Sequence, residues 1–168
     1  MSGATALYSL LGIGILALVL YDVFTTVLHH WGGAGLISGR LAHGVWDVAV
    51  GLTRGMESRR RRYLLGKVGP LLVPGTVVLW AGLLIVGFAL LYLPWLPGSF
   101  HGGRAIPEVG SVGDAIYYSG VTFFTVGYGD IVPVQTGLRL IAMLEGGSGF
   151  ALITLVVSYF TSIYTAYS

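Results

Sequence analysis

The stretch Thr125–Asp130, TVGYGD, holds the residues whose types and spacing could do chemistry. Two glycines alternate with Val126 and Tyr128, and an aspartate ends the run. Glycine takes left-handed backbone angles without a Cβ clash, so this alternation would let successive peptide carbonyls point the same way. Carbonyl oxygens are hard ligands that suit a dehydrated alkali cation, and the Thr125 hydroxyl would add one more oxygen at the inner end of the column. The stretch therefore predicts a cation site built from backbone.

The segments on both sides of this stretch are apolar enough to cross a bilayer. Of the 168 residues, 55% are hydrophobic and only 10% are charged, with a mean hydropathy of +0.82, whereas soluble domains carry about 25% charged residues. A bilayer core requires about 20 apolar residues per helix. Three stretches meet this length: Ala4–Leu28, Pro70–Leu96 and Val134 to about Tyr164. We expect an all-α membrane protein with three transmembrane helices.

A short helix is predicted directly before the hexapeptide. Asp114–Phe124 has room for about three helical turns, too few to cross a membrane, and Ser111 or Asp114 could cap its N-terminus. Non-helical backbone is tolerated at membrane depth only where protein buries it or where it lines a watery path. The negative C-terminal end of the helix would favour a cation on the approach to the carbonyl column. A re-entrant helix and loop of this kind indicate a pore.

With these flanks, TVGYGD resembles the selectivity-filter signature of potassium channels. The resemblance covers the chain from about Pro70 to its end, which sets a pore domain at residues 69–168, with potassium as the permeant ion. The implied filter residues, with potassium sites at the carbonyls of the first four and at the Thr125 hydroxyl, are Thr125, Val126, Gly127, Tyr128 and Gly129. Since one such segment cannot surround an ion and only one occurs, four identical chains are implied.

The resemblance also implies roles for residues around the filter. Tyr128 would point away from the pore and pack against the short helix. Asp130 would lie at the outer mouth, bonded to Tyr118 behind the filter. Many relatives have Thr where this chain has Phe124, and some have a pore-helix Glu where it has Val121, so Asp130 lacks one partner found elsewhere.

The third span carries a cluster of small residues, Gly146, Gly147 and Gly149. Two interpretations stay open: close packing of helices through small residues, or a hinge, since Gly149 falls where related channels place their gating glycine. Glu145 lies at membrane depth, where a carboxylate is a functional candidate, and we interpret it as a protonated or hydrogen-bonded residue that supports the filter. Residues at helical spacing further along are expected to line the pore: Phe150, Ile153, Val157 and Thr161.

The N-terminal part of the chain is expected to comprise a first span at residues 1–30 and a cytoplasmic amphipathic and basic segment at 31–68. The first span would pack against the second, and its Asp22 is explained by a local polar cluster with Thr25 and Thr26. Apolar residues recur at helical spacing over 37–52, which predicts a helix lying in the membrane surface; a fourth crossing is the alternative.

A run of four arginines follows this helix: Arg59, Arg60, Arg61 and Arg62. Under the positive-inside rule the run is cytoplasmic, which places the N-terminus outside, the C-terminus inside and the protein in the plasma membrane. The run also suggests contact with anionic lipid. Its consecutive spacing does not match the every-third-residue pattern of a voltage sensor.

Other functions are less consistent with the sequence. Because the chain has no cysteine, it has neither disulfides nor thiolate metal sites, and His29, His30, His43 and His101 do not cluster with carboxylates. We expect no cofactor and no nucleic-acid partner. GGSG at 146–149 matches the G-x-S-G pattern of rhomboid-type intramembrane proteases, with Ser148 as nucleophile, but no histidine is expected at membrane depth to serve as base. A non-conducting membrane adaptor would leave TVGYGD unexplained.

Overall fold

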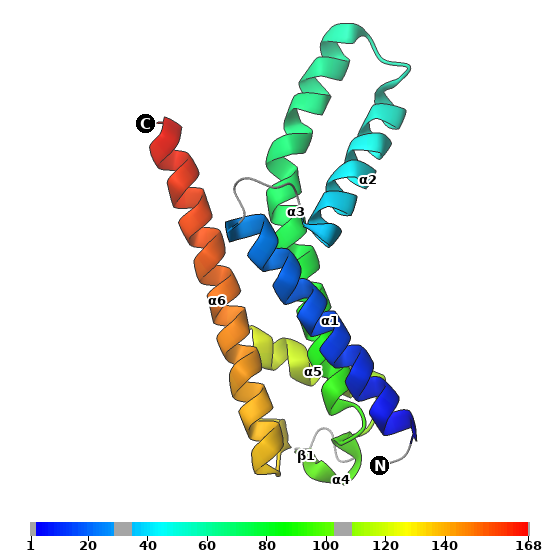
Figure 1. Ribbon diagram of the computed structural model, residues 1–168, viewed down its shortest axis with the longest axis vertical. Helices are drawn as coiled ribbons and strands as arrows, with labels where there is room; N and C mark the ends of the chain where they lie inside the picture. Colours follow the sequence, from blue (N-terminus) through cyan, green and yellow to red (C-terminus); the bar gives the residue numbers. More distant parts are fainter. Residues whose placement is uncertain (1–2, 29–34, 103–108, 168) are drawn as a thin grey trace. The chain divides into compact units, whose positions relative to one another are not determined.

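The computed structural model describes residues 3–28, 35–102 and 109–167, and these are helical almost throughout (Figure 1). The elements in chain order are α1 (Gly3–Leu28), α2 (Leu36–Thr53), α3 (Ser58–Tyr92), α4 (Leu96–Ser99), β1 (Phe100–Gly102), α5 (Val112–Phe123), β2 (Ile131–Pro133) and α6 (Thr136–Tyr167). The all-α class expected from the sequence is confirmed. The strands form one short antiparallel pair, with His101 opposite Val132.

Three helices of the described chain are long and apolar enough to cross a membrane. The candidate spans are Gly3–Thr26, Leu71–Tyr92 and Thr136–Ser158, so the three expected transmembrane helices are confirmed. The second ends at Tyr92, short of the expected Leu96, because a proline follows two residues later and disfavours helical angles in the residue before it.

Helix α3 begins at Ser58, twelve residues before the expected start at Pro70, and it continues through Pro70 and Pro74. Pro70 and Pro74 each lack the N–H that would complete one intrahelical bond, but the loss of these two bonds does not end the helix. The limit expected at residues 68 and 69 therefore falls inside α3, and the limit expected at 30 and 31 lies outside the described residues.

The chain divides into two compact units, Ala17–Trp80 and the combination of Met1–Leu16 with Ala81–Ser168. In the first unit, Asp22 is fully buried near the end of α1. Its carboxylate accepts hydrogen bonds from the backbone N–H groups of Ile37 and Ser38, at 2.7 and 3.0 Å, and from the Trp80 indole at 2.9 Å. Asp22 thus supplies the acceptors that the first turn of α2 lacks.

The expectation that a local cluster explains Asp22 was incomplete, because its carboxylate is satisfied by α2 and α3. The local contribution is confined to Thr25, whose hydroxyl donates to the Asp22 carbonyl, and Thr26, whose hydroxyl bonds to Ser38 across to α2. Gly35 precedes α2, and a Cβ there would collide with the Asp22 carboxylate, which explains the glycine.

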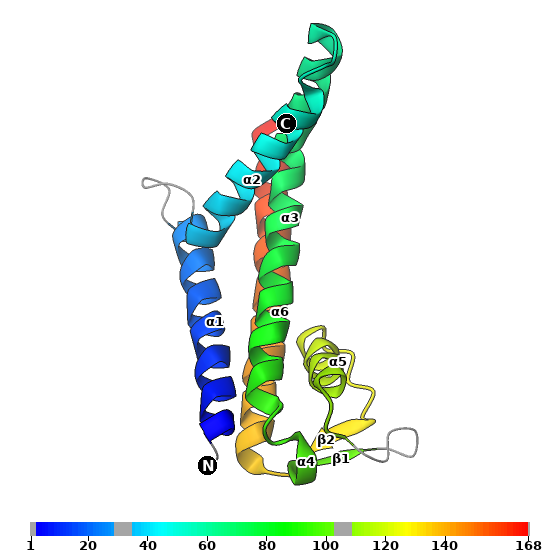
Figure 2. The same cartoon turned by 90° about the vertical axis from the view of Figure 1, so that its right-hand side faces the viewer.

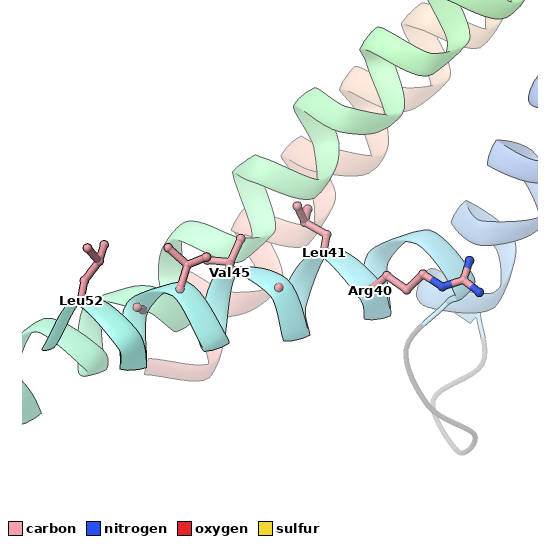
Figure 3. A pocket seen from close by; sticks show the side chains of 7 residues that line it. Arg40, Leu41, Val45 and Leu52 are labelled. Atoms are coloured by element: carbon pink, nitrogen blue, oxygen red, sulfur yellow. The ribbon is translucent and has the colours of Figure 1, made fainter. Parts of the chain in front are cut away.

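Helix α2 is the amphipathic helix expected from the sequence. In both views it runs opposite to the first half of α3 (Figures 1 and 2). Its expected position in the membrane surface stays a prediction. An open apolar groove follows one face of α2 (Figure 3), lined by Arg40, Leu41, Gly44, Val45, Val48, Ala49 and Leu52.

In the second unit, the start of α1 packs against the end of α3 through two glycines. A Cβ at Gly12 would lie 2.7 Å from the carbonyl oxygen of Gly87, and a Cβ at Gly87 would lie 2.8 Å from the Leu16 side chain. Small residues let helix backbones approach closely in a membrane. The expected packing of the first span against the second is confirmed.

The core of this second unit is aromatic. Tyr92 of α3, Phe100 of β1 and Tyr118 of α5 meet edge to face, with ring centroids 5.0 to 5.9 Å apart, a geometry that aromatic quadrupoles favour. Leu138 at the start of α6 packs on the same cluster. Figure 2 shows α5 beside α6, with the strand pair at its end. This core fixes the short helix on which the hexapeptide is mounted.

Candidate functional site

The short helix α5 starts with a complete capping box. The Ser111 hydroxyl accepts from the Asp114 backbone N–H at 3.0 Å, and the Asp114 carboxylate accepts from the N–H groups of Ser111 and Gly110 at 2.8 and 3.1 Å. Both residues expected as caps are therefore used. These backbone hydrogen bonds hold the pKa of Asp114 below its ordinary value. The stabilisation that these hydrogen bonds give the folded state is present when the pH is above the ordinary pKa of an aspartate. It is lost as the pH falls through the lowered pKa of Asp114.

The hexapeptide follows the C-terminal end of α5. In its first five residues, 125–129, which we call the strip, left-handed backbone angles alternate with angles that are not left-handed. Thr125, Gly127 and Gly129 have φ of 55°, 60° and 76°, whereas Val126 and Tyr128 between them are not left-handed. Alternation of right- and left-handed residues brings successive backbone groups of one kind to the same side. The sequence predicted left-handed angles at the two glycines, but Thr125 shows one as well.

Hydrogen bonds to α5 orient the start of this strip. The N–H groups of Thr125 and Val126 donate to the carbonyls of Thr122 and Val121, at 3.0 and 2.9 Å. Because these N–H groups point back toward α5, the other face of the ribbon is left to the carbonyl oxygens. The strip is exposed along its whole length from Thr125 to Gly129 in the single chain. It can therefore present a row of oxygens to a cation.

At the outer end of the strip, Asp130 pairs with a different tyrosine from the one expected. The hydroxyl of Tyr117 donates to the Asp130 carboxylate at 2.6 Å, whereas Tyr118 is buried in the aromatic core. Neighbouring residues on a helix point about 100° apart, so only one of the two can face the strip. The expected Asp130–Tyr118 bond is wrong, and Tyr117 is the residue that sequence reasoning missed.

Tyr128 also differs from the expectation. Its side chain is 71% exposed, so within one chain it is not packed against the short helix. The ring has the area to fill a pocket, but the described residues of the same chain do not provide that pocket.

We expect Tyr117→Phe to weaken conduction through this site. The substitution removes the hydroxyl bound to Asp130, whereas the matched control Tyr118→Phe removes a hydroxyl that Asp130 does not use. The hydrogen bond to the Asp130 carboxylate raises the pKa of Tyr117 from 10.0 to about 12. Because the pKa of Tyr117 is raised, the stabilisation from this hydrogen bond is fully present below pH 10 and is lost as the pH rises toward 12. Ion flux at neutral pH measures the effect, and equal losses in both variants would contradict the pairing.

Glu145 of α6 is fully buried and hydrogen-bonded, as the sequence interpretation proposed. Its carboxyl group contacts the Tyr92 hydroxyl of α3 at 2.8 Å and the Ser119 hydroxyl of α5. Ser119 also reaches the carbonyl of Ile85 at 2.8 Å. Tyr92 and Ser119 carried no sequence signal, since each is an ordinary residue of an apolar helix.

The glycines of α6 differ in their surroundings. A Cβ at Gly149 would overlap the backbone carbonyl of Phe123, the last residue of α5, whereas a Cβ at Gly147 would meet nothing. The described contacts therefore favour the packing interpretation at Gly149. The residues expected to line a pore are exposed in the single chain: Phe150, Ile153, Val157 and Thr161.

The residues that suggested a protease do not form a catalytic arrangement in the described part of the chain. The Ser148 hydroxyl donates to the Glu145 carbonyl in the preceding turn, at 2.7 Å. His43 contacts the Gly39 carbonyl on α2, and His101 lies on β1. His29 and His30 lie outside the described residues. The described residues therefore do not place a histidine base beside Ser148.

The chain is similar to known proteins over the part that contains this site. The family described as ion channel matches residues 76–166, which contain α5, the strip and most of α6. An uncharacterized membrane protein of Bacillus subtilis, YdjJ, is 31% identical over 159 residues, 95% of this chain and 45% of that protein. Protein LctB of Geobacillus stearothermophilus is 32% identical over 88 residues, 49% of this chain and 65% of LctB. The chain thus spans about half to two thirds of these relatives.

No solved structure matches the chain. The family assignment rests on more than half of the sequence, and its limits enclose the strip, α5 and most of α6. Together with three candidate spans, it makes this a multi-pass membrane protein. The chain belongs to the ion channel family.

Proposed function

We propose that this chain forms a potassium-selective channel in which four copies surround one axis and potassium passes without catalysis. The observation that supports this most is the alternation of backbone hand over Thr125–Gly129. A ribbon of this kind offers carbonyl oxygens at regular spacing, and carbonyl rings that replace the hydration shell are how potassium filters work. The ion is the permeant species, and the proposal requires no cofactor.

Exposure of the strip and of α6 supports assembly of several copies. Tyr128 is 71% exposed, and on α6 Phe150 and Val157 are 69% and 60% exposed. In a tetramer, the neighbouring chain would cover Tyr128, while the α6 residues would line an apolar path below the filter. Such a lining can close by dewetting.

Flux from vesicles tests the proposal. Purified protein is reconstituted into vesicles loaded with either potassium or sodium salt, and cation exit is measured against protein-free vesicles. We expect potassium to leave much faster than sodium. Equal rates for the two ions would overturn selectivity, and rates equal to those of empty vesicles would overturn conduction. Ser148→Ala should leave the flux unchanged, because among the described residues the Ser148 hydroxyl bonds within its own helix.

We further propose that the N-terminus lies outside the plasma membrane and that Arg59–Arg62 lie on the cytoplasmic side. Since the chain has no cysteine, single cysteines report topology without background. A membrane-impermeant thiol reagent added to whole cells should label Val112→Cys, and it should label Ser58→Cys only after permeabilisation. The opposite pattern would invert the topology.

We also propose that the four arginines, Arg59–Arg62, contact anionic lipid. Arg62 precedes the candidate span at Leu71 by nine residues, about 14 Å along a helix. This places the near end of the run within roughly one Debye length, about 8 Å, of the headgroup layer. Each such charge is worth about 1 kcal/mol near an anionic surface.

Replacing all four arginines with Gln should therefore weaken binding of the protein to anionic liposomes at low salt, whereas replacing all four with Lys should not. Binding that is unchanged in the Gln variant would remove the proposal.

A further inference from the structure

A buried polar cluster contains more oxygen–oxygen contacts than it has hydroxyl protons. Its members are Tyr92, Ser119, Ile85 and Glu145. Three oxygen–oxygen contacts link the group: Tyr92 to Glu145, Glu145 to Ser119, and Ser119 to the Ile85 carbonyl. Each contact requires one proton between its two oxygens. The Tyr92 and Ser119 hydroxyls supply one proton each, and the Ile85 carbonyl supplies none. One proton is missing if Glu145 is ionised.

We infer that Glu145 carries the third proton and donates a hydrogen bond to Ser119. With this proton, each of the three contacts has one donor and one acceptor. The Tyr92 hydroxyl donates to Oε2 of Glu145, the protonated Oε1 donates to Oγ of Ser119, and the Ser119 hydroxyl donates to the Ile85 carbonyl. Without it, Ser119 must turn a lone pair toward either Glu145 or Ile85, and two acceptors would face each other within hydrogen-bond distance.

The surroundings of Glu145 agree with a neutral acid. The side chain is fully buried, as is Tyr92, and Ser119 is equally inaccessible. A buried carboxylate is tolerated when a cation or several donors compensate it. The hydrogen-bond partners that the described residues offer to Glu145 are two hydroxyls, on α3 and α5. The phenol of Tyr118 lies in the same core, against the Tyr92 ring.

The completed relay ties three helices together. It begins at Tyr92 on α3 and continues to Glu145 on α6. From there it passes to Ser119 on α5 and ends at Ile85, again on α3. Ser119 precedes the strip by six residues on the same short helix. Glu145 is therefore a positioning residue, which holds α5 and, on the proposed function, the filter mounted on it.

The neutral-acid assignment makes the glutamine variant the informative one. In Glu145→Gln, the amide NH₂ can donate to Ser119 and the amide oxygen can accept from Tyr92, so every contact survives. In Glu145→Leu, the volume is nearly kept, but the Tyr92 hydroxyl loses its acceptor, and the Ser119 hydroxyl keeps only its bond to the Ile85 carbonyl. Glu57→Gln is the matched control, because it makes the same chemical change at an exposed position.

Infrared difference spectroscopy of the purified protein reads the proton directly. At neutral pH, the wild type should show the carbonyl stretch of a protonated carboxylic acid, which should be lost in Glu145→Gln and kept in Glu57→Gln. Absence of that band from the wild type, or its persistence in Glu145→Gln, would overturn the inference. This measurement requires neither flux nor the unfolding-prone leucine variant.

Stability and flux then test the positioning role. We expect Glu145→Gln to retain the wild-type midpoint of thermal unfolding and wild-type flux. We expect Glu145→Leu to lower that midpoint and to reduce flux about tenfold or more, because the buried Tyr92 hydroxyl is left without an acceptor. Glutamine and leucine variants that fail equally would show that charge is needed and would overturn the inference. If the wild type conducts no ions, the proposed function fails, while the infrared band and the unfolding midpoint still decide the protonation.

Discussion

Replacing Gly127 with alanine is expected to abolish potassium flux while leaving the protein folded. Gly127 has φ of 60° and lies between residues that are not left-handed. A side chain with a Cβ disfavours this conformation by roughly 1–2 kcal/mol, and four copies of the strip would sum to about 4 kcal/mol or more, roughly a thousandfold in the population of the conducting geometry. The backbone would relax to negative φ and turn a carbonyl away from the row.

Vesicle flux at equal protein content measures this effect, and a thermal unfolding curve checks the fold. Gly51→Ala is the matched control: Gly51 lies in the helix α2, is not left-handed, and a Cβ there would meet nothing. We expect the control to conduct as the wild type does. An alanine variant at 127 that conducts normally would show that the strip does not use its left-handed glycine.

Alanine at Gly149 is expected to destabilise the protein and to reduce flux with it. The added Cβ would overlap the Phe123 carbonyl, a backbone atom that cannot move aside without shifting the end of α5. Overpacking of this kind costs about 1–3 kcal/mol per site. Because the strip begins two residues after Phe123, the displacement would reach the proposed filter.

The neighbouring glycines provide the comparison for this prediction. Gly147→Ala meets no atoms. Gly146→Ala makes only ordinary contacts, at 3.6 Å with the Thr122 carbonyl and at 3.9 Å with the Thr125 side chain. Both substitutions should therefore be neutral or slightly stabilising through improved helix propensity. Thermal unfolding and flux are measured together on all three variants. A Gly149→Ala protein with wild-type stability but altered opening would favour the hinge interpretation over packing.

These two predictions distinguish features of the site that depend on one residue's own backbone from features that depend on contacts between distant parts of the chain. The effect at Gly127 depends on the backbone angles of one residue, which the sequence indicates directly through the spacing of its glycines. The effect at Gly149 depends on a contact with Phe123, 26 positions earlier in the chain. The glycine cluster in α6 was visible in the sequence, but both a hinge and a packing surface were compatible with it.

The sequence by itself determined the elements whose causes are local. Three apolar stretches of bilayer length became the candidate spans, because a helix must satisfy its own backbone groups in lipid. Ser111 and Asp114 set the start of α5, since a cap depends on residues three positions apart. The alternation in TVGYGD set the left-handed positions Gly127 and Gly129.

The tertiary structure alone decided which side chains meet. Helical periodicity gives the face on which a residue lies but not the rotation of that face toward a partner, so Tyr117 and Tyr118 could not be distinguished as partners of Asp130. Asp22 meets Trp80 across 58 positions and Glu145 meets Tyr92 across 53. Such pairs form because a buried polar group must find a partner wherever packing brings one, and packing is a property of the whole chain.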